Sequence, residues 1–144
     1  MTDVPAGYQP LFRSSPFLDT VGPFFSKGEG AAMVIAFRVA EKHCNARGTV
    51  HGGMYATLAD IALGYVTAFS ETPPVPLTTA GLQLDYAGSA KVGDWVEARV
   101  DVQKLGKHLA FVSAYLCVGD ERIVRASGTF LVGGKRGDGA AKAD

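Results

Sequence analysis

One segment, residues 52–69, constrains the fold of this chain more than any other. It reads GGMYATLADIALGYVTAF, and its large apolar side chains recur at the spacing of an α-helix. The other positions are mostly Ala, Leu and Gly, so the predicted helix is apolar nearly all round. Such a helix has to be covered on several sides. The rest of the chain must therefore supply a surface that wraps around it.

The other patterned segments alternate at period two, which is typical of β-strands. In 31–41 the alternating residues are Met33, Ile35, Phe37 and Val39, and further segments follow at 76–87, 94–103, 108–118 and 121–132. The last two are joined by a tight turn at 119–120, which favours an antiparallel meander. We expect an α+β fold in which one antiparallel sheet wraps around one long central helix.

The length of 144 residues fits one domain with its own core. Residues 1–29 are punctuated by Pro and Gly, so we expect an irregular segment with a short helical turn at 16–22 that packs on the domain. Residues 30–132 are predicted to form the domain itself. Residues 133–144, GGKRGDGAAKAD, are small and polar and predict a flexible tail.

Charge and composition exclude several classes of function. Lys plus Arg and Asp plus Glu both number 14, so no net charge points to nucleic acid or to an acidic membrane surface. The chain begins without the pattern of a signal peptide, and its longest apolar stretch is interrupted by Asp60. We therefore expect a soluble, cytoplasmic protein.

Cysteine and histidine spacing gives no sign of a metal centre. Cys44 and Cys117 form no CxxC pair, and Cys117 alternates with apolar residues as a buried thiol would. His43, Cys44 and His51 match no zinc pattern. No metal or other cofactor is expected.

Asp60 is the chemically informative residue of the predicted helix. Apart from His51 when protonated, it is the only charged side chain between Arg47 and Glu71. A carboxylate is costly to bury alone, so one in an apolar helix has either a structural partner or a chemical role.

Gly52 and Gly53 open the same helix. The first N–H groups of a helix have no intrahelical partner, and the helix dipole favours negative charge there. Glycines let a ligand approach this backbone closely. The helix start therefore suits an oxygen that gains negative charge, as in acyl transfer.

Asp60 lies eight residues after Gly52, which is about 12 Å along the helix axis and about 80° around it. One helix cannot bring both groups to one small reacting centre. Two copies packed with antiparallel helices across a two-fold axis can do so. The spacing therefore predicts a homodimer with two equivalent sites, each shared between chains.

Three segments form a combined motif. They are HGGMYATLAD with Asn45 and Gly48 before it, then TTAGLQLDYAGSAKVGDWVEARVDVQKLGK, and finally RIVRASGTFLV. In these segments the chain resembles the hotdog-fold acyl-CoA thioesterases. The similarity is greatest to the phenylacetate-degradation type and its 4-hydroxybenzoyl-CoA thioesterase relatives, and it runs from about Pro16 to Val132. It implies a hotdog fold and hydrolysis of an acyl-CoA to a carboxylic acid and free coenzyme A. It also implies a homodimer, often assembled into a homotetramer.

The resemblance assigns catalytic roles on the helix. Asp60 would be the catalytic carboxylate, as general base on water or as nucleophile. The N–H of Gly52 would polarise the thioester carbonyl, with Gly53 as an additional donor.

Further roles follow from the resemblance around this helix. Asn45 would contact the carbonyl or orient the carboxylate, and His51 would brace the loop and the helix start. Thr79 falls where relatives carry a hydroxyl that holds the water, with Thr78 as the adjacent candidate. Tyr55 is a candidate for the acyl site.

Coenzyme A also carries phosphates, which need cations. Lys104, Lys107 and His108 cluster at a predicted turn after a strand and are candidates to meet those phosphates.

Two other functions remain open for such a chain. One is hydration or dehydration of a thioester, for which His51 would be the working histidine. The other is binding of an acyl-CoA without turnover, an expectation that rests on fold analogy. The sequence leaves the acyl group open.

Overall fold

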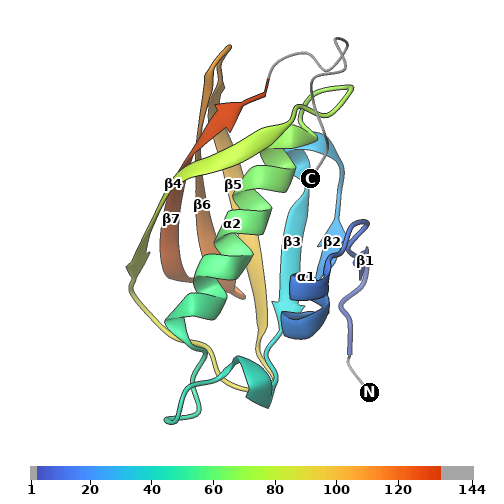
Figure 1. Cartoon of the computed structure of the whole chain (residues 1–144). Coiled ribbons are helices and arrows are strands. Elements are labelled where there is room, and N and C mark those ends of the chain that lie inside the picture. Colours follow the sequence, from blue (N-terminus) through green and yellow to red (C-terminus); the bar gives the residue numbers. More distant parts are fainter. Residues whose placement is uncertain (1–2, 134–144) are drawn as a thin grey trace.

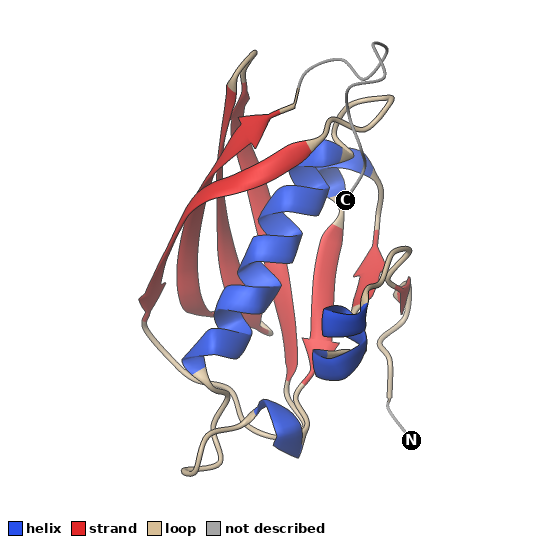
Figure 2. Cartoon of the chain, viewed as in Figure 1, coloured by secondary structure: helices blue, strands red, loops and turns tan. Residues whose placement is uncertain are grey.

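The computed structural model describes residues 3–133, in which one antiparallel sheet curves around one long helix (Figures 1 and 2). The elements in chain order are β1 (Gln9–Pro10), α1 (Pro16–Val21), β2 (Phe25–Lys27), the 3₁₀ turn η1 (Gly30–Ala32), β3 (Val34–Arg38), the 3₁₀ turn η2 (Glu41–His43), α2 (Gly52–Ala68), β4 (Leu77–Tyr86), β5 (Trp95–Leu105), β6 (Leu109–Val118) and β7 (Glu121–Val132). The strand order is β1-β2-β3-β5-β6-β7-β4, and all pairs are antiparallel. The predicted sheet around a central helix is confirmed.

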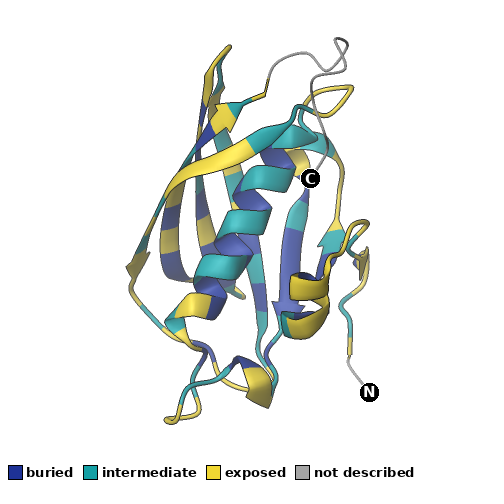
Figure 3. Ribbon diagram, viewed as in Figure 1, coloured by how far each residue is buried: buried dark blue, intermediate teal, exposed yellow. Residues whose placement is uncertain are grey.

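Helix α2 buries one side completely against the concave face of the sheet. Leu58, Ala62, Leu63 and Val66 have no exposed surface. The opposite side is only partly covered (Figure 3); its residues are Ala56, Thr57, Asp60, Ile61, Gly64, Tyr65 and Ala68. The expectation that the helix is covered on several sides therefore holds for all but this one face, and Asp60 lies on it.

The segment before residue 30 extends the sheet. The predicted helical turn is confirmed as α1, whose N-terminus is capped by the Ser15 hydroxyl accepting the Leu18 N–H at 3.2 Å. Strands β1 and β2 were not predicted, because two or three residues between Pro and Gly leave no alternating pattern to detect. Phe25 of β2 pairs with Ala36 of β3, and Tyr8, just before β1, joins them in a second buried cluster, so that β3 is buried on both faces.

The remaining boundaries lie close to the predicted ones. Strand β5 continues through Leu105, so Lys104 belongs to the strand and the turn comprises residues 106–108. The predicted tail falls mostly on residues 134–144, which lie outside the described part. No helix between residues 3 and 133 is both long and apolar enough to cross a membrane.

Candidate active site

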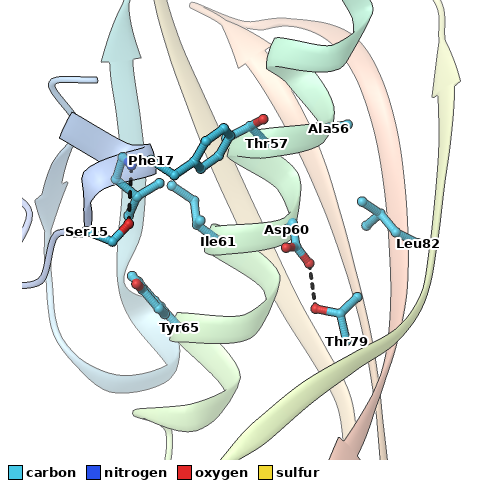
Figure 4. A pocket seen from close by; sticks show the side chains of 10 residues that line it. Ser15, Phe17, Ala56, Thr57, Asp60, Ile61, Tyr65, Thr79 and Leu82 are labelled. Carbon is cyan, nitrogen blue, oxygen red and sulfur yellow. Dashed lines mark hydrogen bonds between the residues drawn. The ribbon is translucent and has the colours of Figure 1, made fainter. Parts of the chain in front are cut away.

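Asp60 meets a hydroxyl group from strand β4. The Thr79 Oγ1–H donates to Asp60 Oδ1 at 2.8 Å, joining the partly covered face of α2 to the edge of the sheet (Figure 4). Thr78 makes no such bond to Asp60. The second carboxylate oxygen of Asp60, Oδ2, accepts no hydrogen bond within residues 3–133. It is therefore available to a ligand or a water molecule.

A β-bulge turns Thr79 toward the helix. The pairing of β4 with β7 shifts register between Thr79 and Gly81, which leaves Ala80 as the extra residue. Side chains three positions apart on a regular strand point to opposite faces. The extra residue instead brings Thr79 and Leu82 to the same side, and both line one cavity beside Asp60.

Two cavities meet at Asp60 and Thr79. The first has a volume of about 510 Å³ and is lined by Ser15, Phe17, Leu18, Ala56, Thr57, Asp60, Ile61, Tyr65, Thr79 and Leu82. The second, of about 630 Å³, extends toward the C-terminal end of α2 and includes Arg13, Phe69 and the segment 74–78. Both volumes lie in the range of small-molecule sites. The carboxylate therefore stands at the junction of two spaces.

Sequence reasoning missed the part of this site that comes from the N-terminal segment. Phe17 and Arg13 lie about 45 residues before Asp60, and no local pattern connects them to it. Ile61 and Tyr65 could have been found as a pair, since they are four residues apart and share one face of α2. Both line the two cavities beside Asp60.

The start of α2 has one backbone donor without an acceptor. The Gly53 N–H donates to His51 Nδ1 at 3.0 Å, and the Met54 N–H donates to the His51 carbonyl at 2.9 Å. Within residues 3–133, no acceptor takes the Gly52 N–H. The Tyr86 hydroxyl, which sequence reasoning did not single out, donates to the Gly52 carbonyl at 2.9 Å and holds this turn in place. Gly52, rather than Gly53, is thus the donor open to a ligand.

Gly52 begins α2, whereas Asp60 lies at the middle of the same helix. Eight helical residues separate them by about 12 Å, and neither cavity beside Asp60 is lined by Gly52. The protomer alone does not bring the carboxylate and the free N–H together.

Asn45 organises the loop before the helix. Its Oδ1 accepts the Arg47 N–H at 2.9 Å and the Thr49 N–H at 3.3 Å, and its Nδ2 donates to the Thr49 hydroxyl at 3.1 Å. It therefore lies near the helix start and does not line the cavities beside Asp60 within the protomer.

The other predicted binding residues are spread over the protomer. Tyr55 is 2% exposed, and its hydroxyl accepts the Ala90 N–H at 2.8 Å, so its ring belongs to the core. Lys104 near the end of β5 and Lys107 and His108 in the following turn are all exposed. This turn adjoins the end of β7, where the Val132 N–H donates to the His108 carbonyl at 2.8 Å.

One thiol and one imidazole, those of Cys117 and His43, belong to the core. Burial raises the pKa of the Cys117 thiol, as expected for an unreactive cysteine. His43 is also buried, and burial lowers its pKa. Residues 3–133 contain no cluster of three or more His, Cys, Asp or Glu side chains able to hold a metal ion.

Comparison with known proteins adds independent findings. The family model described as the thioesterase superfamily matches residues 47–137. The Pseudomonas aeruginosa protein named "Putative esterase PA0474" is 53% identical over 131 residues, which are 90% of this chain and 98% of that protein. Acyl-coenzyme A thioesterase 13 of Homo sapiens is 33% identical over 84 residues, which are 58% of this chain and 59% of that enzyme.

A solved structure is similar over most of the chain. Thioesterase superfamily member 2 of zebra fish superposes with a TM-score of 0.75 at 29% sequence identity. The superposition covers 83% of this chain and 88% of the zebra fish chain.

Proposed function

Because this chain belongs to the thioesterase superfamily, and is thereby a thioester hydrolase, we propose that it hydrolyses acyl-CoA at a site shared between two copies. Asp60 of one copy would act beside the N-terminus of α2 of the other. The observation that carries this proposal is the pair of unused groups on one helix: the Oδ2 of Asp60 and the N–H of Gly52. Because about 12 Å of helix separates them, a second chain is the proposed source of the group that each site lacks.

In the proposed reaction Asp60 is the general base. Its free oxygen takes a proton from water while the water oxygen forms a bond to the thioester carbon. The carbonyl oxygen becomes negative and is stabilised by the Gly52 N–H and the dipole of the partner helix. The carbon–sulfur bond then breaks, and the leaving thiolate takes the proton that Asp60 had accepted, which gives free coenzyme A and restores the carboxylate. The acyl group leaves as a carboxylic acid.

Thr79 would position the carboxylate of Asp60, and Asn45 would position the helix start that carries the Gly52 N–H. The Thr79 hydroxyl fixes one oxygen of Asp60 and leaves the other free to take a proton. Asn45 holds the loop that leads into the helix start, together with Thr49. Lys104, Lys107 and His108 remain proposed contacts for the phosphates of coenzyme A.

A mixing experiment tests the shared site. Asp60→Asn removes the base, and Gly52→Pro removes the backbone donor at the first helical position, where proline is best tolerated. Each variant alone should release almost no thiol from an acyl-CoA. Coexpressed, they form mixed dimers in which one site keeps both wild-type groups and the other has lost both. The mixture should then recover about a quarter of the wild-type activity, by random pairing of the two chains.

Two results would count against the proposal. Activity of the mixture equal to that of the separate variants would show that the two groups do not act across the dimer. Formation of an enoyl or hydroxyacyl thioester without release of thiol would instead indicate hydration chemistry.

A further inference from the structure

The first cavity beside Asp60 owes one wall to the N-terminal segment. Phe17 projects from α1 toward α2, across Thr57 and Ile61, and Leu82 faces it from β4 on the far side of Asp60 (Figure 4). Phe17 is 58% exposed and thus leaves its aromatic surface to the cavity instead of the core. Phe17 therefore offers an apolar surface to a ligand that occupies this cavity beside Asp60.

From this arrangement, and on the premise of the proposed function, we infer that Phe17 determines acyl-chain length by closing the end of the acyl pocket beside Asp60. The thioester carbon must lie near Asp60, so the acyl group extends from there into the adjoining space. Apart from Asp60, the lining of the first cavity carries no charged side chain. It therefore suits an uncharged, apolar acyl group and disfavours one that ends in a carboxylate.

The second cavity differs from the first because a cationic side chain lines it. Arg13 lines it, with its guanidinium 5.9 Å from the centre of the Tyr65 ring. An apolar acyl chain gains nothing from a cation, whereas the polar arm of coenzyme A can do so. The acyl group is thus assigned to the first cavity and the coenzyme A arm to the side of the second.

Phe17 can act as a wall because α1 is held firmly. Leu18 is buried in the main core beside Phe24. At the other end of α1, the His43 Nε2–H donates to the Val21 carbonyl at 2.5 Å, and Lys42 Nζ donates to the Thr20 carbonyl at 3.1 Å. These contacts fix the backbone that carries Phe17.

Chain-length profiles test the inference. The measurement is kcat/KM for straight-chain acyl-CoAs from acetyl to dodecanoyl. In the wild type, each methylene buried in the cavity should raise kcat/KM about fourfold, until the chain reaches Phe17 and the rate falls. Phe17→Ala should move the maximum to longer chains and raise the ratio of dodecanoyl to hexanoyl rates at least about tenfold. Phe17→Trp should move the maximum to shorter chains.

Phe12 provides the matched control. It belongs to the same segment, is 49% exposed and packs on Tyr65 of α2 and on Phe69 just after the helix, yet it lines neither cavity. Phe12→Ala should leave the position of the maximum unchanged. Thermal unfolding of each variant checks that α1 remains in place.

Binding of S-alkyl-CoA thioethers, which cannot be hydrolysed, separates this inference from the proposed function. Calorimetry should show the same dependence on chain length, and the same shift in Phe17→Ala, with no turnover involved. If the wild type did not hydrolyse acyl-CoA but Phe17→Ala still shifted the chain-length dependence of binding, only the proposed function would be overturned. Equal length profiles for the wild type and Phe17→Ala, as expected if a partner chain filled the cavity, would overturn the assignment of Phe17.

Discussion

Thr79 and Asp60 are joined by a 2.8 Å hydrogen bond between the sheet edge and the central helix. The donor comes from β4 and the acceptor from α2, 19 residues earlier in the chain. The bond occupies Oδ1 and leaves Oδ2 free, so it fixes the direction in which the carboxylate can accept a proton. Thr79 thereby acts as a positioning residue for the proposed base.

Replacing Thr79 with Val keeps the β-branched shape and removes the donor. A hydrogen bond to a charged group contributes about 1.5–3 kcal/mol, so we expect kcat to fall about 10- to 100-fold. KM should change little, because the threonine orients the base and does not carry the bulk of substrate binding. Steady-state kinetics with an acyl-CoA and a thiol-detecting reagent measure both constants.

The neighbouring threonine is the control for that variant. Thr78→Val removes an equivalent hydroxyl, one residue away on the same strand, that makes no bond to Asp60. It should keep kcat near the wild-type value, and Thr79→Ser should restore most of the activity. Equal losses in the two valine variants would refute the positioning role of Thr79.

The bulge at Ala80 explains why the sequence did not decide whether Thr78 or Thr79 lies beside Asp60. Regular alternation from Leu82 and Leu84 predicts that residue 78 points toward the helix. The extra residue reverses this alternation and presents Thr79 instead. A bulge changes the count of residues between two strands, and no side-chain pattern in TTAGLQLDY records it.

Other parts of the protein followed directly from the residue pattern. The helical period of residues 52–69 and the alternation in β3, β5, β6 and β7 are long enough to specify each element, and the hotdog fold and the family are confirmed. The wall formed by Phe17 was beyond prediction because it depends on where a short, proline-rich segment crosses the helix. The pairing of two chains at Asp60 and Gly52 stays a prediction.

The helix start offers a test of the free backbone donor. In Gly52→Pro the N–H is absent, whereas Gly52→Ala retains it. His51 has φ −63° and ψ 139°, a conformation that is compatible with a following proline. Loss of one donor to a developing oxyanion typically lowers kcat about 10²- to 10³-fold. We expect a loss of that size in Gly52→Pro, with a thermal unfolding midpoint close to that of the wild type.

Gly52→Ala should lose at most about tenfold, which corresponds to about 1.4 kcal/mol. A methyl group there would lie 3.5 Å from the Tyr86 hydroxyl, an ordinary contact, so the helix start should stay folded. Kinetics and circular dichroism on the two variants measure the comparison. Similar kcat values for Pro and Ala would mean that the Gly52 N–H is not a catalytic donor.

His43 couples the anchoring of α1 to pH. Its Nδ1 accepts the Ala40 N–H at 2.9 Å and its Nε2–H donates to the Val21 carbonyl, so the buried ring is neutral. Burial lowers the pKa of His43 from its ordinary value of 6.5, although the bond to Val21 opposes this shift. As pH falls, the unfolded chain therefore takes up a proton before the folded protein does.

The free energy of unfolding should accordingly be highest above pH 6.5 and decrease as pH falls through the lowered pKa of His43. The contribution of this one group is at most about 1.4 kcal/mol per pH unit. His43→Gln should lower stability at every pH, because it leaves a buried partner without its bond, and it should also make the decline below pH 6.5 less steep. Denaturant unfolding at several pH values measures both effects. His108→Gln changes an exposed histidine and serves as the control variant. If stability fell as steeply with pH in His43→Gln as in the wild type, His43 would not be the group that causes the decline.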